Sequence, residues 1–314
     1  GGGGAEKPKK EKKKPQVKEV SFLEGKRQNE VGLLMGRIKL SNDALKAAIQ
    51  AGDEEVVEED TLRILQQVLP SAEEEQAIEG FIEGGGNREQ LVAADKIVLA
   101  LHEVPACAHR VNGYLFAIRF PPRLEALQDD VATLKGFCAD AKSPLKFKRV
   151  LEIVLRIGNY LNGVSMRGGA YGFKVASLCK LKDVKSTAGE SKGMTLLEFV
   201  VKTCASQHPD LLGWVEELKS VAAAERLSIA QLEADLRDMQ SNVKEAEKAV
   251  PALRQAEAAT QADELEGLCE EMTKQTTELA KTLQEVAAQG KALLEQYGEE
   301  GRSASLDTLC ETLS

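Results

Sequence analysis

The feature that most constrains the fold is a heptad-like spacing of apolar residues through the C-terminal third of the chain. Beyond Glu216, two apolar stripes alternate spacings of three and four residues and are separated by Pro251. The first comprises Ile229, Leu232, Leu236, Met239, Val243, Ala246 and Val250, and the second Leu265, Leu268, Met272, Leu279, Leu283, Val286, Leu293 and Tyr297. Such spacing places side chains on one helical face, which predicts long helices with a coiled-coil or bundle seam. The pattern fits a seam within one chain and a seam between two chains equally.

Composition also favours an all-α chain. Of the 314 residues, 43% are hydrophobic and 29% charged but only 4% aromatic, which is typical of long amphipathic helices rather than of a β-sandwich. This length allows one elongated domain or two. No apolar run approaches the roughly 18 to 20 residues that cross a bilayer, and the N-terminus lacks an apolar signal core. We therefore expect a soluble, cytoplasmic protein without a membrane span.

Residues that hold metals or perform catalysis are few and scattered. The cysteines form no CxxC pair and lie at Cys107, Cys138, Cys179, Cys204, Cys269 and Cys310. Neither a zinc site nor a disulfide framework has this spacing, so we expect reduced thiols packed as small hydrophobes. His102 and His109 are separated by Pro105, and neither has a neighbouring nucleophile or carboxylate in a catalytic spacing. We expect no metal, no cofactor and no enzymatic activity.

Charge is distributed unevenly along the chain. Residues 1–16 hold six lysines and two glutamates, a net +4 that predicts a basic low-complexity linker or a non-native remnant. Residues 142–192 hold eleven Lys and Arg against three acidic residues, a net +8 in a chain whose total is −9. A basic island in an acidic protein favours a docking surface for an acidic partner. A solvated lysine face is the alternative, and the acidic balance and the lack of a recognised motif disfavour nucleic acid.

Shorter helices are expected in the N-terminal part of the chain. A stripe at helical spacing comprises Val31, Leu34, Met35 and Ile38. Leu33 lies off that stripe, which on composition alone predicts an exposed side chain. Ser41 and Ser71 are expected to be N-caps, the latter opening a capping box with the glutamate three residues later. Pro121 and Pro122 predict a turn or kink before a long helix.

Glycines, aromatics and lysines gather in the segment 158–185. An apolar helical stripe stops at Gly158, which predicts the end of a helix at this glycine. A glycine-rich loop follows, containing Gly163, Gly168, Gly169 and Gly172. Glycine loses more backbone entropy on ordering than other residues, so something must hold the loop. The expected apolar anchors are Phe173, Val175, Leu178 and Leu181, and the outward cations Lys174, Lys180, Lys182 and Lys185. The loop lacks the GxxxxGK[ST] form of a nucleotide site.

Three linked motifs occupy this segment: GNYLN at 158–162, RGGAYGFK at 167–174 and KLKDVK at 180–185. In this order they resemble the signature of the formin homology 2 domain, in which GNY[ML]N precedes R-G-x-A-[YF]-G-F-[KN] and K-L-x-D-x-K. Residues 25–40, 97–120 and 194–201 are similar to further segments of that family. The resemblance therefore covers about residues 17–314.

The resemblance implies an all-α, elongated multi-helix domain. Residues 1–16 would precede a core at 17–314, with a helical knob at about 17–110. A post lobe with a connecting helix would follow at about 111–214, and long coiled-coil-like helices at about 215–314. Members of the family nucleate actin filaments and stay at the growing barbed end, regulating elongation at the actin cytoskeleton. They do so as homodimers, and recruit profilin through a polyproline tract that is not present in this sequence.

The resemblance also implies two sets of site residues. Leu33 matches the apolar position that the knob presents to actin, and Lys185 matches an actin-binding lysine. Weaker candidates for the same acidic surface are Lys182, Lys174 and Arg167. In the family an N-terminal lasso with tryptophans wraps the post of a second subunit and closes a ring-shaped dimer. The surface that would receive it corresponds to Gly158, Asn159, Tyr160, Asn162, Gly172 and Phe173.

The sequence departs from the family in three places. Val164 stands where the family usually has glycine, and Gly169 is more flexible than the usual residue. No tryptophan precedes Trp214, so the resemblance does not extend to a lasso. Two alternatives to a nucleating dimer follow: a monomeric core that caps or inhibits barbed ends, and a helical scaffold without actin activity.

Overall fold

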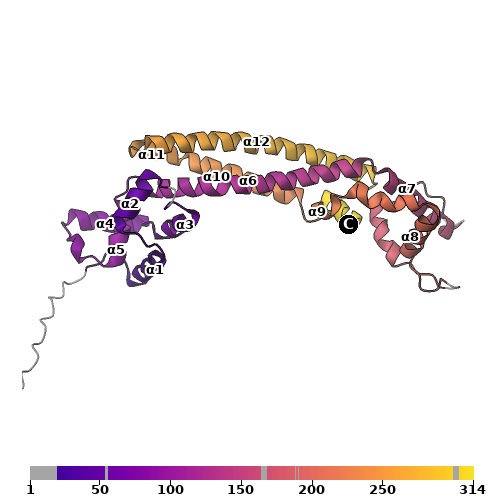
Figure 1. Ribbon diagram of the computed structural model, residues 1–314, viewed down its shortest axis with the longest axis horizontal. Coiled ribbons are helices and arrows are strands. Elements are labelled where there is room, and N and C mark those ends of the chain that lie inside the picture. The colour runs from indigo at the N-terminus through magenta and orange to yellow at the C-terminus, as the bar shows by residue number, and fades with distance from the viewer. Residues whose placement is uncertain (1–19, 54–55, 164–167, 188, 190, 300–303) are drawn as a thin grey trace, which may run out of the picture. The chain divides into compact units, whose positions relative to one another are not determined.

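The computed structural model describes residues 20–53, 56–163, 168–187, 189, 191–299 and 304–314, and these residues form helices joined by turns (Figure 1). Extended pairing among them is limited to two isolated bridges, Val20 with Leu91 and Lys185 with Thr195. The all-α class is confirmed. The chain divides into two compact units, unit 1 within residues 1–119 and 245–268 and unit 2 within 120–244 and 269–314. Among the described helices, none has the length and apolarity to cross a membrane.

Unit 1 is built largely from short helices, and serine side chains cap two of them. Its helices are α1 (Gly25–Met35), α2 (Asn42–Ala51), α3 (Glu59–Val68), α4 (Ala72–Glu83), η1 (Arg88–Gln90), α5 (Ala93–His102), α11 (Ala249–Gln255) and the first parts of α6 (Cys107–Lys142) and α12 (Ala259–Gln296). The Ser41 side chain accepts a hydrogen bond from the Ala44 N–H, and Ser71 and Glu74 form a complete capping box. Both predicted N-caps are therefore confirmed.

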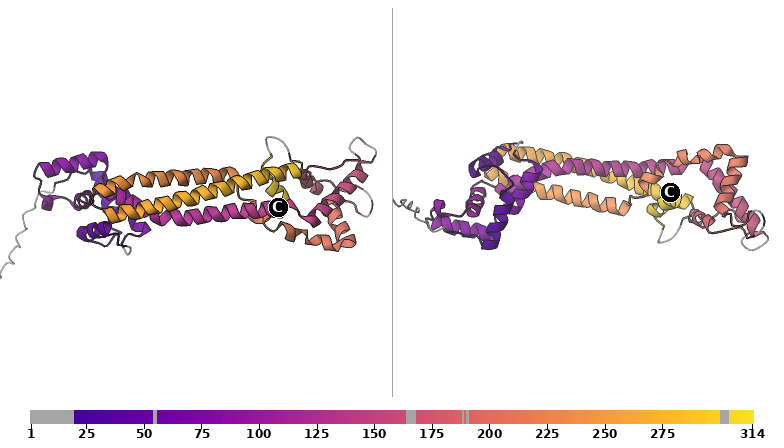
Figure 2. Two further views of the ribbon diagram at one scale, coloured as in Figure 1. Left: turned by 90° about the horizontal axis from the view of Figure 1, so that it is seen from above. Right: turned by 60° about the horizontal axis from the view of Figure 1, so that its bottom comes forward.

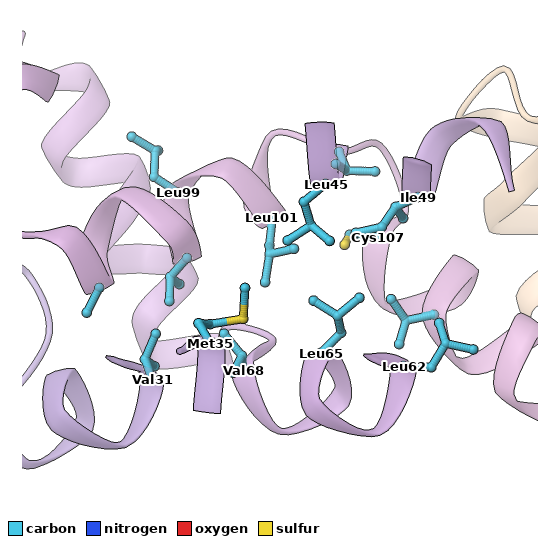
Figure 3. Packing of buried hydrophobic residues seen from close by; sticks show 14 of the residues in the cluster. Val31, Met35, Leu45, Ile49, Leu62, Leu65, Val68, Leu99, Leu101 and Cys107 are labelled. Carbon is cyan, nitrogen blue, oxygen red and sulfur yellow. The ribbon is translucent and has the colours of Figure 1, made fainter. Parts of the chain in front are cut away.

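The core of unit 1 is made by buried residues of α1 to α6 and of the segments that join them. Figure 3 shows Val31 and Met35 from α1 beside Val68, with Leu65 and Ile49 in the same cluster. All five side chains are buried. Leu33 lies on the opposite face of α1 and is 75% exposed, which confirms the exposure expected from its off-stripe position.

Asp95 is the buried acid that holds the start of α1. Its carboxylate is fully buried and accepts hydrogen bonds from the Phe22 N–H (2.8 Å), the Leu23 N–H (3.1 Å) and the Ser21 hydroxyl (2.9 Å). A buried carboxylate is tolerated where several donors replace its lost hydration. Asp95 thereby fixes the backbone that enters the helix carrying Leu33.

Unit 2 is organised around three long helices. The unit 2 parts of α6, α10 (Ile229–Glu247) and α12 lie side by side in all views of Figures 1 and 2. Arg123 pairs with Asp238 at 2.8 Å, and the Tyr297 hydroxyl donates to the Ala141 carbonyl at 2.7 Å. The buried side chains include Leu134, Phe137, Leu236, Met239, Val243, Met272, Leu283 and Val286. The heptad-like stripes therefore meet within this chain.

Of the turn or kink expected at Pro121 and Pro122, the turn is absent, because α6 continues through both prolines. Proline supplies no N–H to the helix and normally destabilises a helix interior. Here Phe120 and Leu124, on either side of the prolines, are both buried in the core. Burial of these apolar side chains offsets the hydrogen bonds that the two prolines cannot donate, so here the prolines do not end the helix.

The remaining helices of unit 2 are α7 (Leu145–Asn162), η2 (Val175–Lys182), α8 (Leu196–Gln207), η3 (Pro209–Leu218), α9 (Val221–Ala224) and α13 (Leu306–Leu313). The expected end of a helix at Gly158 was wrong. α7 passes through this residue and ends at Asn162, followed by the C-cap residue Gly163 with a positive φ of +53°. A glycine inside a helix costs only about 1 kcal/mol relative to alanine. Burial of Val154 and the packing of Ile157 against the same cluster support the continuing helix.

The first turn of α7 is capped by a side chain from another helix. The Glu217 carboxylate accepts from the backbone N–H groups of Lys146 (2.8 Å) and Phe147 (3.2 Å). An acid at a helix N-terminus satisfies unpaired donors and interacts favourably with the helix dipole. We expect Glu217→Ala to lower the free energy of unfolding by about 1 to 2 kcal/mol, measured by urea denaturation. Glu216→Ala, at the exposed neighbouring position, is the control, and equal losses for both variants would contradict the capping role.

Candidate functional site

Three of the four expected cationic residues lie exposed in one segment of unit 2. Lys174 precedes η2, Lys182 ends it, and Lys185 follows, all three with exposed side chains. Arg167 lies outside the described residues. The backbone beside Lys185 is held by hydrogen bonds from the Leu196 N–H to the Val184 carbonyl (2.8 Å) and from the Ser186 N–H to the Met194 carbonyl (2.9 Å). Lys185 is therefore an exposed cation on a fixed backbone.

Lys185 lies on the wall of a groove between α7 and α8. The groove has a volume of about 800 Å³. Its lining includes the apolar side chains of Ile157, Leu161, Val184 and Phe199, together with Tyr160 and Lys185. Tyr160 is 86% exposed. The structure thus places in one groove a residue from each predicted set: Lys185, predicted to bind actin, and Tyr160, predicted to receive the lasso.

Glu198 of α8 interacts electrostatically with Lys185. Glu198 forms a capping box with Thr195, whose backbone N–H donates to its carboxylate at 2.7 Å. This backbone hydrogen bond, then one with the Thr195 side chain and more weakly the charge of Lys185, lowers the pKa of Glu198. Glu198 therefore stays ionised at neutral pH and orients α8 beside Lys185.

The remaining lasso-receiving candidates have different surroundings. Gly158 lies inside α7, and Asn162 is the exposed last residue of that helix. Exposed Gly172 and half-buried Phe173 line a second cavity, of about 680 Å³, together with Lys174 and residues 295–298. Phe173 also packs against the buried cluster of Val154, Val200 and Cys204. It anchors the loop from inside as well as lining the cavity.

The side chain of Asn159 is used within the chain. Its Nδ2 donates to the Ala170 carbonyl at 2.9 Å, and its Oδ1 accepts from the Ala170 N–H at 2.8 Å. This pair of bonds joins α7 to the glycine-rich loop. Tyr171, the next residue, is fully exposed and was missed in the sequence analysis. An aromatic residue within a glycine-rich run was the signal that would have found it.

The described residues show binding surfaces rather than clustered reactive groups. Among them, no group of three or more His, Cys, Asp and Glu residues could hold a metal ion. Burial raises the pKa of the Cys107 thiol to about 12 and, with smaller contributions from neighbouring groups, that of Cys310 to about 12. These two thiols stay protonated and pack as apolar side chains. The apolar groove with its exposed lysine suits recognition of a protein surface.

Comparison with known proteins agrees with the motifs of this surface. Human protein diaphanous homolog 3 is 29% identical over 235 residues, covering 75% of this chain and 19% of the relative. Mouse disheveled-associated activator of morphogenesis 1 is 30% identical over 234 residues, covering 74% of this chain and 21% of the relative. Formin-like protein 17 of Arabidopsis thaliana is 27% identical over 305 residues, covering 96% of this chain and 60% of the relative.

The chain thus spans about a fifth of the length of the two animal relatives and 60% of the plant relative. The family model described as Formin Homology 2 Domain matches residues 3–314. That match includes both units and all three motifs around Lys185. The chain belongs to the formin homology 2 domain family.

Proposed function

We propose that this chain binds actin, promotes filament nucleation and associates with the growing barbed end in the cytoplasm. The observation that carries the proposal is the exposed Lys185 on a fixed backbone at the rim of an apolar groove, within the motif that it shares with the family. Leu33, exposed on α1 of unit 1, is the proposed apolar contact. Lys174, Lys182 and Arg167 are proposed as further cations for the same acidic surface.

The proposed mechanism is selective binding without covalent chemistry. A protein that binds a filament-like arrangement of actin subunits more tightly than free monomers shifts the equilibrium toward that arrangement. An apolar contact at Leu33 and a cationic contact at Lys185 would supply that difference. Exposed charges act mainly on the association rate and on selectivity, so binding at Lys185 should weaken as salt rises.

The test is a pyrene-actin assembly assay with the wild-type chain, Leu33→Asp and Lys185→Asp. We expect the wild-type chain to change the assembly rate and each substitution to reduce that effect at least tenfold, since each reverses the chemistry of a proposed contact. Lys281→Asp, at an exposed lysine of α12 with the same charge change, is the control and should behave as wild type. Equal effects of Lys185→Asp and Lys281→Asp would contradict a specific contact at Lys185.

A second candidate is a monomeric core that slows or caps barbed-end growth. It would apply if the proposed lasso-receiving surface, on which Tyr160 is exposed, stays without a partner in solution. Light scattering on the same samples distinguishes the two. A dimeric mass with faster assembly supports nucleation, whereas a monomeric mass with slower elongation supports capping. No effect on actin by any variant would favour a helical scaffold.

A further inference from the structure

The helix η2 leads directly to the proposed cationic contacts. It is a 3-10 helix of eight residues, Val175–Lys182, and Lys182 is its last residue. Lys185 follows three residues later. The hydrogen bonds of a 3-10 helix have poor geometry, and runs longer than about four residues are uncommon. Contacts from elsewhere in the chain must therefore hold η2, and they also set the positions of both lysines.

One side of η2 packs against α7 and α8. Its half-buried leucines, Leu178 and Leu181, contact the buried cluster that these two helices form. Val175, the first residue of η2, is also buried. Beyond η2, the isolated bridge of Lys185 with Thr195 ties the chain to the start of α8. These contacts hold one side of η2 and the segment after it, but they leave its N-terminus to be satisfied by another group.

The group that satisfies the N-terminus of η2 is the side chain of Glu299. Lys174 occupies the N-cap position and makes no capping hydrogen bond, since an ammonium group has no acceptor. The Glu299 carboxylate instead accepts from the Ala176 N–H at 2.7 Å. This N–H is one of the donors that an N-cap side chain usually satisfies, and a carboxylate there also interacts favourably with the helix dipole. Glu299 thus supplies the cap that Lys174 cannot.

Glu299 is presented from a fixed backbone at the end of α12. Gly298 has a φ of +70°, and its N–H donates to the Glu295 carbonyl at 3.2 Å. The Glu299 N–H donates to the Leu294 carbonyl at 2.8 Å. These two bonds form a Schellman motif, which ends a helix in one defined conformation. The half-buried Glu299 is therefore an acceptor that is already in place for η2.

The helix α13 also packs against η2, and against α9. Its apolar face is buried and comprises Leu306, Leu309, Cys310 and Leu313. Gly290 of α12 allows the close approach of this face, because a Cβ atom there would lie 3.2 Å from a methyl carbon of Leu306. At the other end of α13, the Ser314 hydroxyl donates to the Glu225 carboxylate at 2.8 Å. The C-terminal residues of the chain thus contact η2 through both Glu299 and α13.

We propose that Glu299 is a positioning residue for the cationic contact of this chain, and that it acts together with α13 by holding η2 and hence Lys182 and Lys185. This inference rests on the proposed function, which makes the acidic partner actin. Glu299 acts through the Ala176 N–H. Its own negative charge would repel an acidic surface, so a direct effect of that charge would have the opposite sign: its removal would strengthen binding.

Glu299→Ala and Glu299→Gln separate the hydrogen bond from the charge. Glu299→Ala should weaken binding to actin barbed ends about fivefold, the factor that corresponds to one lost helix cap. Glu299→Gln should bind as wild type does, because its amide oxygen can accept from the same N–H. The measurement is the concentration of chain that half-saturates its effect on the elongation of actin seeds. Glu295→Ala, which removes an exposed acid from the same end of α12, is the control and should behave as wild type.

Three results of this comparison would overturn the positioning role of Glu299. Unchanged binding in Glu299→Ala would show that the cap does not matter for the partner. Equal weakening by Glu299→Ala and Glu299→Gln would show that the charge matters and the hydrogen bond does not. Tighter binding by both variants would show that Glu299 acts directly on the acidic surface.

Hydrogen exchange on the free chain gives a readout that does not depend on actin. Glu299→Ala should accelerate exchange of the Ala176 amide, and Glu299→Gln should largely restore it. Leu309→Ala, or the milder Leu313→Ala if the first variant does not fold, should accelerate exchange of the Asp183 amide, which closes the end of η2 on the Lys180 carbonyl. Glu311→Ala, at an exposed position of α13, is the control. Unchanged exchange of Ala176 would overturn the role of Glu299, and unchanged exchange of Asp183 that of α13.

A mutant cycle distinguishes failure of this inference from failure of the proposed function. In a chain with both Lys182→Ala and Lys185→Ala, Glu299→Ala should cause no further loss, since no cation remains to be positioned. Multiplied losses would show that Glu299 acts elsewhere and would overturn the proposal. If Lys185→Asp weakens actin binding and Glu299→Ala does not, the function stands and the assignment of Glu299 is wrong. If the wild-type chain binds no actin, both are wrong.

The mass of the chain in solution provides the last control. Glu299→Ala and wild type should have the same mass by light scattering, because the cap is proposed to act on the cationic contact. A change of mass without a change in actin binding would show that η2 serves association with a second copy, which also overturns the proposal.

Discussion

Phe137→Ala should destabilise unit 2 by about 3 to 5 kcal/mol, the cost of deleting a large aromatic from a close-packed core. Phe137 is fully buried in α6 and is among the largest fully buried side chains. Its helix is tied to α12 through Tyr297 and to α10 through the ion pair of Arg123 with Asp238. Loss of the ring leaves a cavity that long helices cannot close by a small shift. Urea unfolding monitored by circular dichroism measures the change.

Tyr171→Ala is the matched control for that substitution. It removes an aromatic ring of nearly the same size from a fully exposed position in the same unit. Its expected effect on unfolding is within about 0.5 kcal/mol, as for most surface substitutions. A loss below about 1 kcal/mol for Phe137→Ala would contradict close packing around Phe137, because a phenylalanine buried in a close-packed core should not be removable at so low a cost.

Asp95→Ala should destabilise unit 1 by about 2 to 4 kcal/mol. The substitution removes the acceptor of the Phe22 N–H and one acceptor of the Ser21 hydroxyl, and it leaves the Leu23 N–H with the Ser21 oxygen alone, at 3.1 Å. A buried donor that loses its acceptor costs about 1 to 3 kcal/mol. The loss should appear first as faster hydrogen exchange at Phe22 and Leu23. Because these residues enter α1, weaker presentation of Leu33 should follow.

Asp95→Asn is the informative control at the same position. Oδ1 accepts both backbone N–H groups, and the amide oxygen of asparagine can replace it without the charge. We expect Asp95→Asn to retain most of the stability that Asp95→Ala loses. Equal destabilisation by both variants would show that the negative charge, rather than the hydrogen-bond acceptor, holds the start of α1.

Local signals were sufficient for much of the fold. The caps at Ser41 and Ser71 depend on residues within one helical turn, and the exposure of Leu33 depends on the phase of one helix. These features depend only on residues close to one another in the sequence, so they were predicted correctly. The apolar stripes predicted long helices, but only the packed structure showed that their seam lies within the chain.

The errors occurred where burial by distant residues overrides a local rule. Pro121 and Gly158 both favour a break, yet helices α6 and α7 continue through them because their neighbours are buried. The hydrogen bonds between Asn159 and Ala170 could not be predicted from the sequence either, since they depend on the path of the loop between the two residues. The actin contacts and the division into knob, post and C-terminal helices remain predictions.

The proposed binding of this chain to the growing barbed end of actin filaments can be observed on single filaments. The measurement is imaging of filaments that grow in the presence of the fluorescently labelled chain. We expect label that stays at one filament end while that end elongates or stalls, with dwell times shortened at least tenfold by Lys185→Asp but not by Lys281→Asp. Label distributed along filament sides, or absent from both ends at micromolar concentration, would contradict it.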